Sequence, residues 1–286
     1  MKLFTIPNLF TLGNLLCGCL AIVFALDGDL KWSAYLVGIA AVLDFFDGFV
    51  ARLLNSSSPI GKELDSLADC VTFGVVPGIV LMQLMNADLR SNFYSNVITS
   101  SLFEHGGNNI PPIIFPMALI GLVVSLFSAL RLAKFNIDTR QSESFIGVPT
   151  PAIGMLVAAL SLMIDVNPAL LGNKQLLFES YSLTIFDTAF NYVLTADNWF
   201  SNYWFLAGFS VVASFLLISE LPLFALKFKK FGWKGNEVRY SFLVGCAVMI
   251  AFLGYAGIAL SIVAYIVLSF VLWFMNRGKE STNTAQ

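Results

Sequence analysis

The sequence predicts an all-helical, polytopic membrane protein. Hydrophobic residues make up 57% of its 286 residues, whereas charged residues make up only 12%. A typical soluble domain is about 25% charged, so this chain has too few charges to cover a soluble surface. The mean hydropathy of +0.79 excludes a disordered chain, and the net charge of −2 without a basic segment argues against nucleic-acid binding.

Apolar segments in the sequence determine the predicted membrane spans, because a helix needs about 20 mostly apolar residues to cross the hydrocarbon core. Uncharged stretches of about this length are Pro7–Leu26, Cys70–Ala87, Ile110–Leu130, Phe145–Ile164 and Asn198–Ser219. Trp32–Leu54 is also long enough, although it contains Asp44, Asp47 and Arg52. These segments predict six spanning helices.

A longer uncharged run, Tyr240–Asn276, would be about 55 Å long as a single helix, nearly twice the thickness of the hydrocarbon core. We expect it to turn at Gly254–Gly257 and form two helices, which brings the number of spans to eight. Residues 1–276 then make a single transmembrane domain, and residues 277–286 a short, disordered cytoplasmic tail. The loop from Asp165 to Asn202 shows no chemistry that we can interpret.

The distribution of basic residues predicts the orientation of these helices. With the N-terminus in the cytoplasm, all Lys and Arg residues fall on cytoplasmic segments except Lys31, Arg90 and Lys174. Such a bias is typical of the cytoplasmic side of membrane proteins. Both termini are therefore predicted to be cytoplasmic.

Four aspartates stand out because acidic residues within membrane spans are costly and are usually functional. Asp44 and Asp47 are three residues apart and share a face of the second helix, and Asp65 and Asp69 are four apart at the start of the third. The short connection between the two helices contains the turn residues Ser56–Pro59 and Gly61. We expect all four carboxylates to point at one place, near the cytoplasmic headgroups.

The residue types in this cluster predict its metal preference. The only histidine is His105, and no Cys-x-x-Cys pair occurs, so the sequence argues against a multi-His zinc site and a His-based triad. Clustered carboxylates suit Mg²⁺ or Mn²⁺, with Ca²⁺ a further candidate, and four are enough for two divalent ions. The alternative is that the acids form interhelical ion pairs with Arg52, Lys62 and other bases.

The exact spacing resembles the signature of the CDP-alcohol phosphotransferase family. The matching pattern is D-x2-D-G-x2-A-R-x8-G-x3-D-x3-D, here Asp44, Asp47, Gly48, Ala51, Arg52, Gly61, Asp65 and Asp69. The resemblance implies an intramembrane transferase that moves a phosphatidyl group from a CDP-lipid to an alcohol and releases CMP. It also implies a homodimer, and it implies that Asp69 is the general base as well as a candidate metal ligand.

Three further stretches are similar to the phosphatidylserine synthase branch of that family. They are Ile6–Gly18, Arg131–Asn136 and Gly147–Pro151. This similarity implies CDP-diacylglycerol and L-serine as substrates, and a multi-pass protein of the cytoplasmic (inner) membrane whose active site faces the cytoplasm.

The candidate binding residues for the CDP-lipid are Asn8, Thr11, Gly48, Ala51, Arg52, Ser58 and Gly61. Gly48 would let the nucleotide approach the helix backbone or would serve only helix packing. Arg52 would clamp a diphosphate or lie at the membrane interface. Ser58 would lie near the nucleotide or belong to the turn, and Asn8 and Thr11 would contact the cytosine or cap the first helix.

Arg131 and Asn136 are the candidates for binding the serine carboxylate, with cytoplasmic anchoring of the membrane segment as the alternative role for Arg131. Two other functions remain open at this point. Another alcohol, glycerol 3-phosphate or inositol, would fit the same signature. A cation transporter would use the acids to bind its ion, although acids on several helices and an inverted repeat would then be expected.

Overall fold

The computed structural model describes residues 4–56, 58–98, 116–138, 147–164, 200–221, 223, 232 and 236–283, and only the backbone of 93–98 and 276–283. Within these ranges every regular element is helical. The elements are α1 (Ile6–Asp27), α2 (Leu30–Leu53), α3 (Pro59–Asp69), η1 (Cys70–Val75), α4 (Val76–Ile98), η2 (Pro116–Leu122), α5 (Val123–Ile137), α6 (Thr150–Met163), α8 (Tyr203–Ile218) and α9 (Glu237–Asn283). The all-helical class is therefore confirmed for the described residues.

Five of these helices are long and apolar enough to cross a bilayer. They are Ile6–Asp27, Leu30–Leu53, Pro59–Asn92, Pro116–Ile137 and Glu237–Met275, while α6 and α8 are shorter apolar helices. Large apolar side chains such as Leu16 and Val23 of α1 are exposed on the outside of the protein, where a membrane protein meets lipid instead of water. The structure thus agrees with a membrane protein of several spans.

A tight turn pairs α1 with α2. Gly28 ends α1 in the left-handed conformation (φ 90°), and the Asp29 side chain then accepts a hydrogen bond from the Trp32 N–H at 3.1 Å, which caps α2. Because the turn is so short, the two helices pack antiparallel. The start of α1 consequently lies beside the end of α2, which carries Asp44 and Asp47.

The third span differs from its predicted bounds. It begins at Pro59 instead of Cys70, because Ser58 caps the helix by accepting from the Gly61 N–H at 3.0 Å and Pro59 occupies the first turn. The uncharged stretch Cys70–Ala87 is the apolar part of this helix, which begins 11 residues earlier. Asp65 and Asp69 therefore lie within α3, and a π-helical segment, η1, follows Asp69 directly before α4 begins.

The helix from Pro59 to Asn92 is the most buried of the five long helices. Gly74 and Gly78 lie against α5 and η2 of the same chain, where an added Cβ would press on Ser128 and Ser125. The Gly74-x3-Gly78 motif therefore serves close packing within the protomer.

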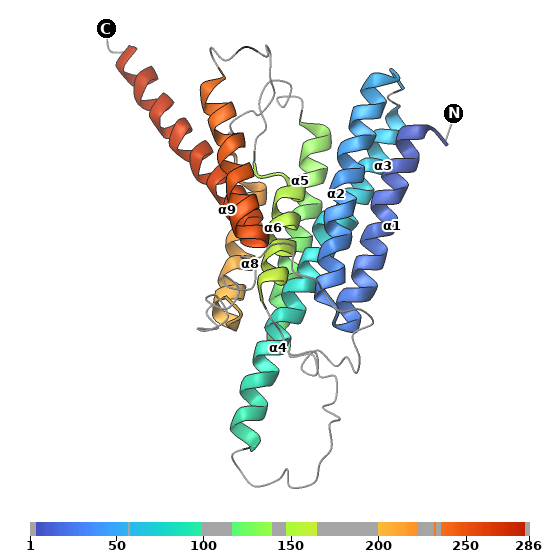
Figure 1. The fold of residues 1–286 in the computed structure, drawn as a ribbon, viewed down its shortest axis with the longest axis vertical. Coiled ribbons are helices and arrows are strands. Elements are labelled where there is room, and N and C mark those ends of the chain that lie inside the picture. Colours follow the sequence, from blue (N-terminus) through green and yellow to red (C-terminus); the bar gives the residue numbers. More distant parts are fainter. Residues whose placement is uncertain are drawn as a thin grey trace.

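The last long helix turns where the sequence predicted. Gly254 has a non-helical backbone with φ 54°, and a Cβ on Gly257 would collide with the Met249 backbone, so α9 consists of two arms that approach closely at glycines. The two ends of the chain lie at the same end of the molecule, together with the α2–α3 connection (Figure 1). The predicted disordered tail is wrong in part, because α9 continues to Asn283.

The other predicted bounds change at their ends. The helix expected over Phe145–Ile164 begins only at Thr150, because Pro149 precedes it in extended conformation. The helix expected over Asn198–Ser219 is Tyr203–Ile218, and most of the loop 165–202 lies outside the described residues.

Candidate active site

The carboxylates of Asp44, Asp47 and Asp65 form one cluster between α2 and α3. One oxygen from each side chain lies within 4.8 Å of the corresponding oxygens of the other two. Asp47 is buried, and the other two are partly buried. The short α2–α3 connection brings the two helices together at this point, as the sequence predicted.

Asp69 lies one helical turn beyond Asp65 and completes the group. Its carboxyl group interacts electrostatically with those of Asp44 and Asp65, and the residue is only 9% exposed. The side-chain amide of Asn14 donates to Asp69 Oδ1 at 3.2 Å. All four predicted carboxylates are therefore brought together.

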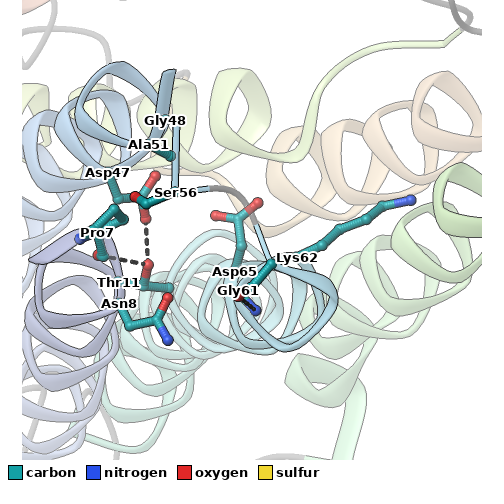
Figure 2. Close-up of a pocket in the computed structure, with 11 residues that line it drawn as sticks. Pro7, Asn8, Thr11, Asp47, Gly48, Ala51, Ser56, Gly61, Lys62 and Asp65 are labelled. Carbon is teal, nitrogen blue, oxygen red and sulfur yellow. Dashed lines mark hydrogen bonds between the residues drawn. The ribbon is translucent and has the colours of Figure 1, made fainter. Parts of the chain in front are cut away.

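Polar side chains of α1 hold the cluster from the other side. The Thr11 hydroxyl donates to Asp47 Oδ2 at 2.6 Å (Figure 2), and the Asn14 backbone carbonyl accepts from the Thr72 hydroxyl at 3.2 Å. Asn14 was missed as a site residue. The signal was present in the sequence, because Asn8, Thr11 and Asn14 recur every three residues and so form a polar stripe on an otherwise apolar helix.

Ion pairs with basic residues do not account for these acids in the described part of the chain. Among the residues that the structure describes, none of the four aspartates forms an ion pair with a Lys or Arg. Arg52 is exposed, and the Lys62 ammonium extends away to donate to the Asn136 carbonyl at 3.5 Å. The interhelical ion pairs considered as an alternative are therefore absent from the described part of the chain.

The donor atoms of the cluster fit a divalent cation. Carboxylate oxygens are the ligands preferred by Mg²⁺, Mn²⁺ and Ca²⁺. Asp65 Oδ1 is buried and has no hydrogen-bond partner, although buried polar atoms in proteins are nearly always paired. An oxygen in this condition, beside two further carboxylates, is suited to metal coordination.

A cleft of about 230 Å³ opens beside the cluster, between α1, α2 and α3 (Figure 2). Its lining residues are Pro7, Asn8, Thr11, Asp47, Gly48, Ala51, Ser56, Ser58, Gly61, Lys62 and Asp65. Six of the seven candidates for CDP-lipid binding are in this set, and Arg52 is the exception. The α1 and α2 residues are far apart in sequence, so the helix packing creates the cleft.

Two glycines shape the cleft in different ways. A Cβ on Gly48 would meet no atom within 4 Å, so helix packing does not explain this glycine and it leaves open space beside Asp47. A Cβ on Gly61 would lie 3.1 Å from both Asn8 Oδ1 and Ser58 Oγ, so this glycine permits a close approach of α1 and α3. Ser58 itself has the capping role described above.

The two candidates for acceptor binding are not brought together. Arg131 is 7% exposed, interacts electrostatically with Asp69 and places its guanidinium 5.3 Å from the centre of the Phe135 ring. Asn136 instead donates to the Ser66 hydroxyl at 3.0 Å. Five residues correspond to about 140° around a helix, so Arg131 and Asn136 cannot share one face of α5.

Glu220, a further acid just beyond the end of α8, takes no part in the cluster. It forms an exposed ion pair with Lys134 of α5 at 3.1 Å. Lys227, a second basic residue that the sequence offers as a partner for Glu220, lies outside the described residues.

Comparison with known families agrees with the geometry of the site. Residues 4–186 match the family model for CDP-alcohol phosphatidyltransferase, which covers more than half of the chain. The protein belongs to this family. The match includes all four aspartates and every residue that lines the cleft.

Named relatives are similar over much of the chain. The CDP-diacylglycerol–serine O-phosphatidyltransferase of Helicobacter pylori (strain 26695) is 35% identical over 231 residues, covering 78% of this chain and 85% of its own. The enzyme of that name from Bacillus subtilis (strain 168) is 37% identical over 166 residues, which cover 58% and 79%. The archaetidylserine synthase of Methanothermobacter thermautotrophicus is 29% identical over 159 residues, covering 55% and 58%.

Proposed function

We propose that this protein transfers a phosphatidyl group from CDP-diacylglycerol to L-serine, forming phosphatidylserine and CMP. The observation that carries the proposal is the four-carboxylate cluster beside the cleft, in a chain that belongs to the CDP-alcohol phosphatidyltransferase family. The choice of serine is supported by the relatives from Helicobacter and Bacillus, which are named for serine transfer.

The carboxylates have two proposed tasks. Asp44, Asp47 and Asp65 hold two divalent ions, Mg²⁺ or Mn²⁺, with Ca²⁺ as a further candidate, and Asp69 contributes to the same set. Bound ions would neutralise charge on the diphosphate of the lipid and on the leaving CMP. The Thr11 hydroxyl and the Asn14 amide orient Asp47 and Asp69 for these tasks.

The transfer is an in-line displacement. The serine hydroxyl oxygen attacks the β-phosphorus of CDP-diacylglycerol, the bond from that phosphorus to the CMP oxygen breaks, and the hydroxyl proton passes to Asp69. Because Asp69 is nine-tenths buried and is the last residue of α3, it is shielded from bulk water. A carboxylate is a weak base for a hydroxyl, so positioning must supply much of the rate.

The cleft holds the CDP end of the lipid. Asn8, Thr11, Gly48, Ala51, Ser58 and Gly61 line it, and the open space at Gly48 admits the nucleotide. Arg52 is exposed one turn beyond Gly48, and we place it at the membrane surface, where its guanidinium can contact the diphosphate as it enters.

The proposed topology is a single domain, residues 1–276, with eight crossings, both termini and the active site on the cytoplasmic side of the inner membrane. The turn at Gly254 and the two shorter apolar helices support eight crossings. The common end of both termini supports an even number (Figure 1). A homodimer is part of the proposal on the family relationship alone.

Release of CMP tests the function. Purified protein receives CDP-diacylglycerol, Mn²⁺ and one of three alcohols, namely L-serine, glycerol 3-phosphate or inositol. We expect CMP and phosphatidylserine with L-serine only, and none after chelation of the metal. Release with another alcohol alone would overturn the choice of serine, and no release with any of the three would overturn the transferase.

A further inference from the structure

Several buried polar atoms have no hydrogen-bond partner, and two of them belong to Asn14 and Arg131, which interact with Asp69. Among the described residues, the atoms in this condition include Asn14 Oδ1, Ser128 Oγ, Arg131 Nε and Thr150 Oγ1. Protein interiors rarely leave such atoms unpaired, because each costs free energy unless a ligand or water completes it. Arg131 and Thr150 are on α5 and α6, outside the nucleotide cleft.

Contacts between helix ends show that α6 begins at the same end of the molecule as α3. Lys62 of α3 donates to the carbonyl of Asn136 at the end of α5. Lys134, also at the end of α5, pairs with Glu220, and the Gly147 N–H donates to the Leu221 carbonyl at 2.9 Å. The starts of α3 and α6 and the ends of α5 and α8 therefore lie at one end of the molecule, and α6 runs in the same direction as α3.

This direction places Thr150 at the level of Asp69. A Cβ on Gly154 would lie 3.1 Å from Phe73 Cα, so these two positions are in contact. Thr150 precedes Gly154 by four residues and shares its helix face, and Asp69 precedes Phe73 by four residues. Thr150 is fully buried, so its hydroxyl faces the protein interior next to the acidic cluster.

Arg131 reaches the same level from α5. Ser128 lies against Gly74, where an added Cβ would be 3.0 Å from Ser128 Cβ. Arg131 is three residues farther toward the common end, is 7% exposed, and interacts with Asp69. Its guanidinium and the Thr150 hydroxyl thus converge on Asp69 from two helices.

The start of α6 adds little further donor capacity. The Ala152 and Ile153 N–H groups both donate to the Pro149 carbonyl, and Pro151 has no N–H. An anion next to Thr150 would therefore accept from the Thr150 hydroxyl and from Arg131.

We propose that Arg131 of α5 and the Thr150 hydroxyl at the start of α6 form the subsite for the carboxylate of the acceptor amino acid. The inference rests on the proposed function and identifies the acceptor as a small alcohol that carries a carboxylate. The nucleotide cleft lies on the opposite side of Asp65, between α1, α2 and α3, so the two substrates approach the acidic cluster from different sides. Asn136 takes no part, because its amide binds Ser66.

Substitution of the buried hydroxyl tests the subsite. Thr150→Val keeps the shape of the side chain but removes its hydrogen-bond donor. Because a hydrogen bond to a charged group is lost, the KM for L-serine should rise about tenfold. The KM for CDP-diacylglycerol should stay within about twofold of the wild-type value. Thr150→Ser keeps a hydroxyl and should retain the wild-type KM. Ser161→Ala is the matched control, because Ser161 lies on the same helix and bonds only to the Ala158 carbonyl.

A second acceptor identifies the group that is bound. L-Serinamide has the hydroxyl and amine of serine but no carboxylate. Because Arg131 and the Thr150 hydroxyl both bind the carboxylate of L-serine, the wild type should favour L-serine over L-serinamide by at least about 100-fold in kcat/KM. This preference should fall about tenfold in Thr150→Val and further in Arg131→Gln. An unchanged KM for CDP-diacylglycerol also shows that each variant is folded.

The outcomes separate the two proposals. If the wild type makes phosphatidylserine but Thr150→Val and Arg131→Gln keep its preference for L-serine, the subsite is wrong and the function stands. If these variants raise the KM for CDP-diacylglycerol instead, the bound anion is the lipid diphosphate and the subsite is wrong. If the wild type releases no CMP with L-serine, the proposed function itself fails.

Discussion

The two sides of the acidic cluster are built differently. The nucleotide side is formed by α1, α2 and α3, which follow one another in the chain through short turns, and its lining lies within residues 7–65. The acceptor side is formed by the end of α3, by α5 and by α6, which contribute Asp69, Arg131 and Thr150 from positions spread over more than 80 residues. The signature between Asp44 and Asp69 therefore describes most of the first side, whereas the second side has no such compact signature.

The largest expected effect comes from the residue that both sides share. Asp69→Asn should lower kcat about 10²–10⁴-fold, the usual contribution of a general base, while binding of CDP-diacylglycerol is retained. CMP release and lipid binding by the purified variant measure the two quantities. Asp88→Asn is the matched control, since Asp88 lies away from the cluster and accepts from the Tyr203 N–H at 3.0 Å. A wild-type rate in Asp69→Asn would remove Asp69 from catalysis.

The next largest effect is expected at Asn14 of α1, which orients the proposed general base Asp69. Asn14→Ala removes the donor to Asp69 Oδ1 and should lower kcat about 10–100-fold, the range found when a residue that orients a functional ligand is lost. The KM for L-serine should stay within about twofold, because Asn14 approaches Asp69 from the nucleotide side.

Asn202→Ala provides the comparison for Asn14→Ala. Asn202 caps α8 by accepting from the Trp204 N–H at 2.9 Å and lies far from the cluster, so its loss should affect stability alone. If Asn14→Ala changed the KM for L-serine and left kcat intact, Asn14 would belong to the acceptor side instead.

A smaller effect is expected where α6 packs against η1. In Gly154→Ala the new Cβ would lie 3.0–3.1 Å from Phe73, so α6 must shift slightly away. Overpacking of this kind costs about 1–3 kcal/mol. We expect a lower melting temperature and a severalfold higher KM for L-serine, with an unchanged KM for CDP-diacylglycerol.

Gly208→Ala on α8 is the control for that substitution, because its Cβ would meet nothing within 4 Å. It should leave the melting temperature and both KM values unchanged. Equal increases of the two KM values in Gly154→Ala would mean that the two sides of the cluster are not independent.

The smallest effect is expected at the common end of α5 and α8. Lys134 and Glu220 are 42% and 62% exposed, and exposed ion pairs contribute about 0–1 kcal/mol to stability. Lys134→Ala should therefore leave kcat and both KM values within about twofold. A tenfold rise in the KM for L-serine would show that the acceptor side extends outward to this pair.

Local patterns in the sequence were sufficient for the nucleotide side. The spacing of Asp44, Asp47, Asp65 and Asp69 predicted a cluster, and the four carboxylates are together in the structure. The turn at Gly254 followed from the length of the last apolar run. These predictions depend on helical periodicity and on bilayer thickness, which are both local properties of the chain.

Predictions that required a particular partner helix were less complete. Arg131 and Asn136 are close in sequence but point in different directions, and Asn14 was passed over although it contacts Asp69. Periodicity shows which residues share a face of one helix, but it does not show which other helix that face meets.

The sequence by itself determined that this chain is an all-helical membrane protein with an acidic cluster, because the cost of placing polar groups in lipid restricts where charges can occur. The tertiary structure decided what surrounds that cluster. Close packing at Gly18, Gly74 and Gly154 sets the helices against one another, and so brings Asn14, Arg131 and Thr150 to Asp69. Such contacts depend on the shapes of several helices at once, which no single segment of sequence contains.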